Sequence, residues 1–214
     1  MTAKSSVDLG FVHRFDPGTD PDAPTLLLLH GTGGDENDLI PLGRALAPGA
    51  ALLSARGKAL EHGMPRFFRR LAEGVFDQDD LKQRTAELAA FIEAASREYR
   101  IQQERLIAVG FSNGANIAAS TLLRYPDGLA GAVLIRAMVP FVPEQTPRLA
   151  QKPILLLGGE RDSIVPRKQT EELASIFRSA GADVSLHWEP ADHALTPGDV
   201  AIAREWLGRF AARP

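Results

Sequence analysis

The sequence predicts an α/β fold with a mainly parallel, twisted sheet and helices on both faces. Short, wholly apolar runs, which are typical of strands buried on both sides, alternate with longer segments of helical period. Such alternation along one chain places the helices on the two faces of the sheet. The 214 residues contain no internal repeat, low-complexity tract or linker, so we expect one domain over residues 1–214.

Six apolar runs are the predicted parallel strands, and the first of them, rich in leucine, ends at a glycine. They span residues 26–29, 51–54, 106–110, 132–135, 154–157 and 184–188. Residues 7–15 mix polar and apolar side chains, which predicts an antiparallel edge strand.

Helix signals fill the intervals between these runs. Asp77 can cap a long helix whose apolar residues recur at steps of three, four and seven. Thr196 followed by Pro197 is typical of a helix start, and Pro166 opens another helix that stops at Gly181. The remaining predicted helices span residues 37–47 and 112–123.

Two stretches interrupt the alternation of strands and helices. Residues 55–76 have no clear period, and residues 137–152 carry three prolines. Long irregular connections often form the walls or lids of functional sites. Because the second stretch is too short for a lid domain, we expect an open site with walls from both stretches.

The composition excludes several classes of function. A formal net charge of −3 gives no basic surface for nucleic acid. The absence of cysteine excludes a disulfide framework, a cysteine-ligated metal and a thiol nucleophile. The first residues lack the apolar core of a signal peptide, and no apolar run could cross a bilayer. We therefore expect a cytoplasmic protein with no nucleic-acid and no membrane partner.

A G-x-S-x-G sequence at residues 110–114 lies between a predicted strand and a predicted helix. In such a turn small residues flank the serine, because the backbone is strained and closely packed, and the hydroxyl is lifted above the sheet edge. A tight turn with a capping serine is the alternative. The strand–turn–helix context favours Ser112 as a nucleophile.

A serine hydroxyl is a weak nucleophile unless a base accepts its proton. His193 is the predicted base, because it follows the last predicted strand, at the same edge as Ser112; an exposed loop histidine is the alternative. The second imidazole N–H needs an acceptor. Asp162 follows the strand at 154–157 and is the predicted acceptor, with Glu160 in reserve; Asp162 could instead be a turn residue or a helix cap.

Acyl transfer also needs N–H donors for an oxyanion. We expect one from Asn113, the residue after the nucleophile, and one from Thr32 in the glycine-rich loop at residues 30–34. That loop lacks the last glycine of a dinucleotide-binding G-x-G-x-x-G, and the chain has no paired-histidine metal signature. We expect no cofactor and no metal.

The chain order Ser112, Asp162, His193 is that of α/β-hydrolases. Residues 29–39 (LHGTGGDENDL) and 110–115 (GFSNGA) resemble the phospholipase/carboxylesterase family, the branch that includes acyl-protein thioesterases. Further similar segments are residues 63–70 (GMPRFFRR), 138–140 (MVP) and 192–195 (DHAL). The resemblance extends over nearly the whole chain, suggests a bacterial subgroup of small hydrolases, and implies the same triad. It is also the only indication of a homodimer.

Three further residues are candidate substrate contacts. Met138 is a candidate wall of the pocket, with a core position as the alternative. Arg66 and Phe67 could receive an acyl or aromatic group beside an anionic one. We favour a structural role, in which the rings anchor the loop and the arginines pair with nearby carboxylates. Those carboxylates are Glu61, Glu73 and Asp77.

One departure from related sequences concerns the pocket. Where they often carry His-Pro, this chain has Arg136-Ala137, so we expect the polarity of the pocket floor or wall to differ.

The leading hypothesis is a serine hydrolase of small carboxylic esters, short-chain or aryl, that forms an acyl-enzyme on Ser112. A thioesterase or lysophospholipase is the nearest alternative, because the same machinery serves all acyl groups. A non-catalytic small-molecule receptor on the same fold is an alternative of a different class.

Overall fold

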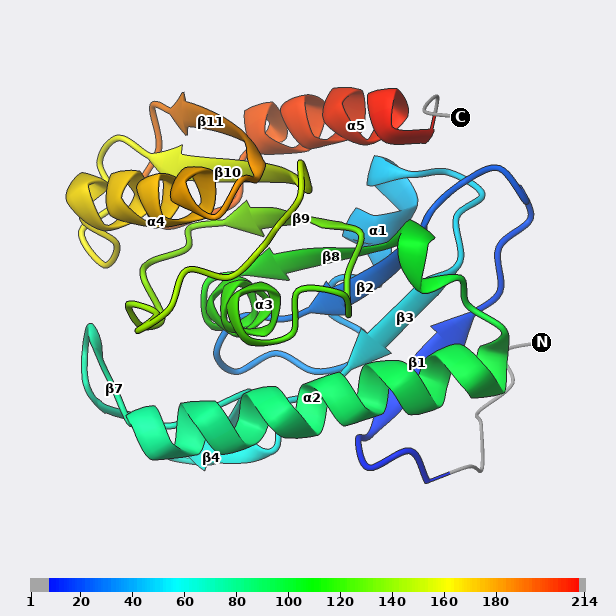
Figure 1. Cartoon of the computed structure of the whole chain (residues 1–214), viewed down its shortest axis with the longest axis horizontal. Helices are drawn as coiled ribbons and strands as arrows, with labels where there is room; N and C mark the ends of the chain where they lie inside the picture. The colour runs from blue at the N-terminus through cyan, green and yellow to red at the C-terminus, as the bar shows by residue number, and fades with distance from the viewer. Residues whose placement is uncertain (1–7, 212–214) are drawn as a thin grey trace.

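A seven-stranded sheet is the centre of the protein, whose computed structural model describes residues 8–211 (Figure 1). Its strands are β1 (His13–Asp16), β2 (Thr25–Leu29), β3 (Leu52–Ala55), β8 (Leu106–Phe111), β9 (Gly131–Ile135), β10 (Pro153–Gly159) and β11 (Asp183–Glu189). They lie in the order β1-β3-β2-β8-β9-β10-β11. All neighbours are parallel except β1 and β3. The predicted α/β class is confirmed, and the predicted antiparallel edge strand begins later, at His13, with residue 7 outside the described part.

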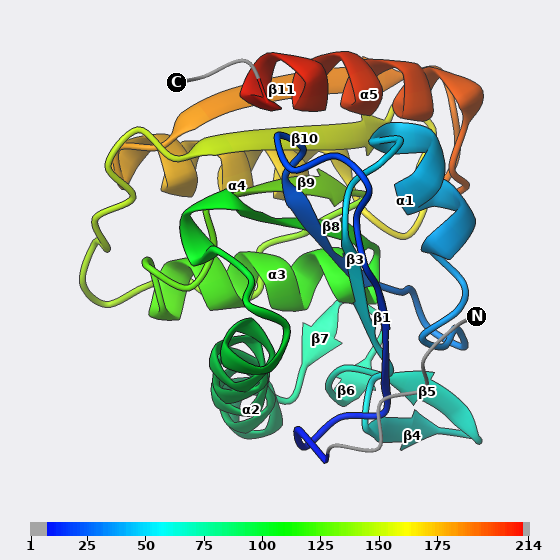
Figure 2. The same ribbon diagram turned by 90° about the vertical axis from the view of Figure 1, so that its right-hand side faces the viewer.

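Helices cover both faces of the sheet, as predicted (Figure 2). They are α1 (Ile40–Leu46), α2 (Gln78–Tyr99), α3 (Asn113–Arg124), α4 (Arg167–Ser179) and α5 (Pro197–Ala211). One apolar core lies under α1 and α5, and a larger one lies under the other three helices. Burial of these two faces supplies most of the driving force for folding. No helix in the described part of the chain is both long and apolar enough to span a membrane.

The predicted helix caps are present. The Asp77 carboxylate accepts a hydrogen bond from the Asp80 N–H at the start of α2 (3.1 Å). At α5 the Thr196 hydroxyl accepts from the Asp199 N–H (3.1 Å), and the Asp199 carboxylate accepts from the Thr196 N–H (2.9 Å). This reciprocal pair satisfies two N–H groups that the helix cannot use. The helix predicted at 37–47 is shorter, because residues 36–39 form turns before α1 begins.

Residues 55–76 were expected to be irregular, and that prediction is wrong in part. They contain two small hairpins, β4 (Ala59–Glu61) with β5 (Met64–Arg66), and β6 (Arg70–Ala72) with β7 (Val75–Phe76). Strands of two or three residues are too short to produce a detectable alternation in the sequence. Residues 137–152 contain no helix or strand, in agreement with the absence of a lid domain.

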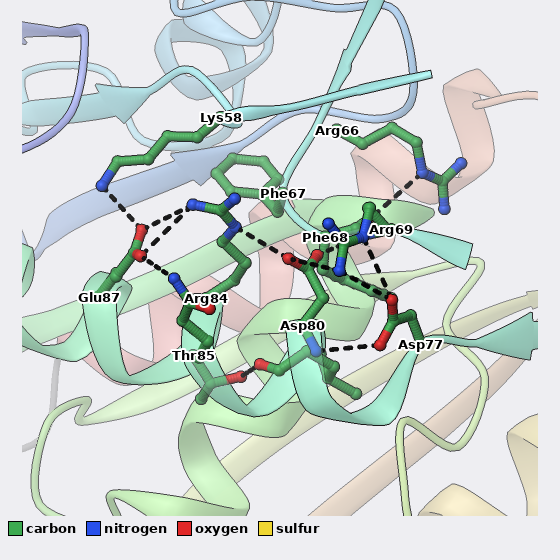
Figure 3. Close-up of polar contacts among 12 residues, drawn as sticks. Lys58, Arg66, Phe67, Phe68, Arg69, Asp77, Asp80, Arg84, Thr85 and Glu87 are labelled. Atoms are coloured by element: carbon green, nitrogen blue, oxygen red, sulfur yellow. Dashed lines mark hydrogen bonds and ion pairs between the residues drawn. The ribbon is translucent and has the colours of Figure 1, made fainter. Parts of the chain in front are cut away.

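The hairpin segment, residues 56–76, is held against α2 by ion pairs and one buried carboxylate (Figure 3). Lys58 pairs with Glu87 of α2 (2.8 Å), and Asp77 pairs with Arg69 (3.0 Å). The buried carboxylate of Asp80 accepts from the Arg69 N–H (2.7 Å). A carboxylate that accepts a backbone N–H fixes the position of the chain more firmly than an exposed ion pair does. The segment is therefore a fixed wall rather than a loose loop.

Candidate active site

The predicted site residues meet at the carboxyl edge of the sheet. Thr32 follows β2, Ser112 follows β8, Asp162 follows β10 and His193 follows β11. Parallel strands all end at the same edge, and this edge is where open α/β sheets form their sites. The spatial order of the strands brings together residues that are up to 161 positions apart, from 32 to 193.

Ser112, His193 and Asp162 form a continuous hydrogen-bonded path. His193 Nε2 lies 2.8 Å from Ser112 Oγ, and His193 Nδ1 lies 2.8 Å from Asp162 Oδ2. The Asp162 side chain is only 1% exposed, and its Oδ1 accepts the N–H groups of Ile164 and Val165 (2.9 Å each). Asp162 therefore stabilises the turn with one carboxylate oxygen and faces the imidazole with the other. The two roles considered for it, a turn residue and the acceptor for His193, are both present.

The turn that carries Ser112 is strained and closely packed. Ser112 has φ 52° and ψ −112°, a conformation that side-chain-bearing residues rarely adopt. A Cβ at Gly110 would lie 2.6 Å from the Cα of Ala115, and one at Gly114 would lie 2.0 Å from the carbonyl oxygen of Leu29. Neither contact is sterically allowed, so both glycines of the G-x-S-x-G sequence are required by packing.

This packing predicts that Gly114→Ala destabilises the protein, because its Cβ would push α3 away from β2. We expect a loss of about 1–3 kcal/mol and a fall in Tm of about 3–10 °C, measured by thermal unfolding. Gly208→Ala on α5 is the matched control, since nothing lies within 4 Å of its Cβ position. The control should be neutral or slightly stabilising. Equal Tm values for Gly114→Ala and the wild type would contradict the packing argument.

The two expected oxyanion donors are available. Within the described chain, neither the Thr32 N–H nor the Asn113 N–H donates a hydrogen bond, and both residues line the same cavity as Ser112. Asn113 is also the first residue of α3, where the helix dipole favours negative charge. Hydrogen bonds from the hairpin segment hold the side chains of both residues. Thr32 Oγ1 accepts from the Arg66 guanidinium (2.6 Å), and Asn113 Oδ1 accepts from the Phe67 N–H (2.7 Å).

The cavity above Ser112 has a volume of about 230 Å³. Met138 forms part of its wall, and the Met138 N–H is held by Asn116 Oδ1 (2.9 Å). Phe67 does not line the cavity; its ring is buried and lies 4.8 Å from the His30 ring. The full lining is Thr32, Arg66, Arg70, Gly74, Phe76, Phe111, Ser112, Asn113, Asn116, Met138, Ile164, Val165 and His193.

Arg66 and Arg70 share one carboxylate. Glu61 accepts from Arg70 Nε (2.8 Å) and from Arg66 Nη1 (3.2 Å). Burial lowers the pKa of Arg66, the charge of Arg70 lowers it further, and Glu61 opposes both effects. The hydrogen bond from Arg70 in turn holds the pKa of Glu61 below its usual range. The predicted pairing of these arginines with Glu61 is present, but this one carboxylate balances only one of the two positive charges.

Arg136 does not lie in the pocket, which corrects the expectation that it changes the polarity of the pocket wall. Its guanidinium is fully buried and pairs with both carboxylate oxygens of Asp199 (2.7 and 2.9 Å). It also donates to the carbonyls of Leu157 (3.2 Å), Asp192 (3.1 Å) and Ala194 (2.9 Å). The last two carbonyls flank His193. The buried Arg136–Asp199 pair therefore holds the loop that carries the imidazole.

Several cavity residues were missed from the sequence as site residues. Asn116 lies one helical turn after Ser112, on the same face of α3, and this spacing could have revealed it. Phe76 enters the cavity from the short strand β7, and Ile164 and Val165 enter it from the connection after β10; neither segment carries a motif. Arg70 gave no signal beyond its membership of a basic and aromatic cluster.

No group of three or more His, Asp or Glu side chains is arranged to hold a metal ion within residues 8–211. The remaining histidines near the site are engaged in other contacts. His30 is buried, bonds to the Gly31 carbonyl (2.6 Å) and accepts the Gly57 N–H (2.9 Å). Among the described side chains, His193 is thus the histidine that faces Ser112.

Comparisons with known proteins find similar sequences and structures over nearly the whole chain. The model of the phospholipase/carboxylesterase family matches residues 14–209. The crystal structure of a Bacillus cereus carboxylesterase is 47% identical and has a TM-score of 0.92, covering 94% of this chain and 95% of that one. A carboxylesterase from Mesorhizobium loti is 31% identical with a TM-score of 0.90, covering 97% and 98%. The hydrolase MhqD of Bacillus subtilis (strain 168) is 47% identical over 194 residues. The match covers 91% of this chain and 96% of MhqD.

Proposed function

Because the chain belongs to the phospholipase/carboxylesterase family, we propose that it is a serine hydrolase that cleaves carboxylic esters through an acyl-enzyme on Ser112. The observation that carries the proposal is the path from Ser112 Oγ through His193 to Asp162, with both links at 2.8 Å. A nucleophile, its base and an orienting carboxylate in hydrogen-bond contact are the requirements of covalent acyl transfer.

In the first half-reaction Ser112 Oγ attacks the ester carbonyl carbon while His193 Nε2 takes the hydroxyl proton. The carbonyl oxygen becomes an oxyanion, which the N–H groups of Thr32 and Asn113 stabilise. Asp162 stabilises the imidazolium and keeps the Nδ1 proton in place. The tetrahedral intermediate then expels the alcohol, which receives its proton from His193 Nε2, and Ser112 remains acylated.

In the second half-reaction a water molecule acts as the nucleophile, and the same steps follow. His193 takes a proton from the water, whose oxygen attacks the acyl carbon and forms a second oxyanion at the same donors. Collapse of this intermediate breaks the bond to Ser112 Oγ, which regains a proton from His193. The carboxylic acid leaves, and the enzyme returns to its starting state with no cofactor consumed.

The size of the cavity supports short-chain or aryl esters as substrates. About 230 Å³ is below the range of about 300–1,000 Å³ that is typical of sites for drug-sized ligands. Met138 and Arg66 are the proposed substrate contacts among the residues predicted from the sequence, because both line this cavity. We do not propose a substrate contact for Phe67.

The proposal predicts a short optimum in a series of p-nitrophenyl esters from acetate to dodecanoate, measured as kcat/KM. We expect acetate to butyrate to be turned over fastest, with a steep fall toward the longer chains. A maximum at dodecanoate would instead indicate a lipase-like or lysophospholipase-like site. Matched oxygen esters and thioesters of one acyl group then separate an esterase from a thioesterase. Tight binding of esters without turnover would indicate a receptor.

A further inference from the structure

Arg66 brings a buried and incompletely paired charge to the cavity. Its side chain is 95% buried, since only 5% of it is exposed, yet it lines the cavity beside Ser112. Nη1 donates to Thr32 Oγ1 and Glu61, and Nε donates to the Phe68 carbonyl. In the described part of the protein, Nη2 has no hydrogen-bond partner. A buried guanidinium with an unused nitrogen at a cavity surface is suited to receive an anion.

Arg70 adds a second charge to the same cavity wall. Its Nε donates to Glu61, while its two terminal nitrogens have no partner among the described residues. Glu61 therefore balances one of two adjacent positive charges and does not itself line the cavity. No aspartate or glutamate is part of the lining, so the wall presents a net positive charge to a ligand.

The neighbouring carboxylates do not balance this charge. Figure 3 shows Asp77, Asp80 and Glu87 engaged with other cations of the hairpin segment and α2, while the Arg66 guanidinium points away from them. Those other cations are Lys58, Arg69 and Arg84. Each of these three cations is thus paired with a carboxylate at α2, whereas Arg66 and Arg70 face the cavity and share one carboxylate.

We infer that Arg66 and Arg70 form an anion subsite beside Ser112, and that the preferred substrates are esters which carry a carboxylate near the scissile bond. This inference rests on the proposed esterase function and names its substrate class. Nη2 of Arg66 and the terminal nitrogens of Arg70 donate to the substrate carboxylate. Because Arg66 also holds Thr32, the bound carboxylate lies close to the proposed oxyanion donors.

The test compares anionic esters with neutral isosteres. Monoethyl succinate and ethyl succinamate place the carboxylate or amide on the acyl side, and 4-acetoxybenzoate and 4-acetoxybenzamide place it on the alcohol side. The quantity measured is the ratio of kcat/KM between the two members of each pair. For the wild type we expect the anionic member to be favoured about tenfold or more in one pair.

The variants are Arg66→Met and Arg70→Gln, and each should reduce that ratio about tenfold. Arg69→Gln is the matched control, because it removes the positive charge next to Arg70 in the sequence. The Arg69 side chain is exposed, pairs with Asp77 and does not line the cavity. The control should keep the wild-type ratio. If Arg66 only positions Thr32, Arg66→Met will slow both members of a pair equally, and that outcome overturns the subsite, as does a wild-type preference for the amides.

A binding measurement separates this inference from the proposed function. In the Ser112→Ala background, calorimetry with 4-acetoxybenzoate needs no turnover, and adding Arg66→Met should weaken Kd about tenfold. If Arg66→Met weakens the binding of 4-acetoxybenzoate but the wild type does not hydrolyse the ester, the proposed function is contradicted and the anion subsite is supported. If the wild type hydrolyses the esters, no variant alters the ratio of kcat/KM between anionic and neutral esters, and Arg66→Met does not change Kd, only the anion subsite is contradicted.

Discussion

Ser112→Ala is expected to lower kcat for p-nitrophenyl acetate by about 10⁶-fold, the loss seen when a triad nucleophile is removed elsewhere. The physical reason is that, among residues 8–211, Ser112 Oγ is the hydroxyl in hydrogen-bond contact with His193 Nε2. The donors of Thr32 and Asn113 remain, so a residual rate above that of water should persist. KM should change little, because the cavity walls are intact.

The control for this variant is Ser163→Ala. Ser163 is exposed, lies near the site in sequence next to Asp162, and does not line the cavity. Its kcat should equal that of the wild type. Retention of more than about one thousandth of the activity by a correctly folded Ser112→Ala protein would contradict covalent catalysis at this position.

Arg136→Met is expected to cost about 3–5 kcal/mol of the free energy of unfolding, because it leaves the Asp199 carboxylate buried and uncompensated. Removing both charges should behave differently. In Arg136→Met with Asp199→Leu no buried charge remains, and apolar replacement of a buried pair is often neutral or stabilising. Asp199→Leu also removes the carboxylate that accepts the Thr196 N–H at the start of α5, which costs about 1 kcal/mol. We therefore expect the double variant to recover part of the stability lost in the single one, as measured by chemical denaturation.

Activity should not recover together with stability. The double variant still lacks the donors to the Asp192 and Ala194 carbonyls, so the loop that carries His193 loses its support. We expect kcat to stay well below the wild-type value while KM is nearly unchanged. Arg209→Met, which removes one member of an exposed pair on α5, is the control and should alter neither property measurably. A fully active double variant would show that Arg136 serves folding only.

The sequence predicted the sheet and the triad candidates because each leaves a local signal. Continuous apolar runs mark buried parallel strands, and a parallel sheet places the ends of those strands at one edge. Knowing that Ser112, Asp162 and His193 each follow such a run was therefore enough to expect them together. The helix starts at Asp77 and Thr196 were predictable for a similar reason, since capping uses side chains within one turn.

The remaining features depend on contacts between distant segments. The destination of the Arg136 side chain is set by a carboxylate 63 positions later, and nothing near Arg136 indicates it. The pairing of Arg66 and Arg70 with one shared glutamate depends on two hairpins whose strands are too short to predict. Phe67 was a candidate substrate contact because it lies in a basic and aromatic cluster, but its ring is buried against His30, as in the structural role that the sequence favoured.

The most direct test of the account is to trap the nucleophile with a fluorophosphonate and to locate the adduct by tandem mass spectrometry. We expect one adduct per chain, on the peptide that contains Ser112. Labelling should be absent in Ser112→Ala and greatly slowed in His193→Ala, since the base is needed to activate the hydroxyl. Labelling of a different residue, or no adduct on a protein that hydrolyses esters, would contradict it.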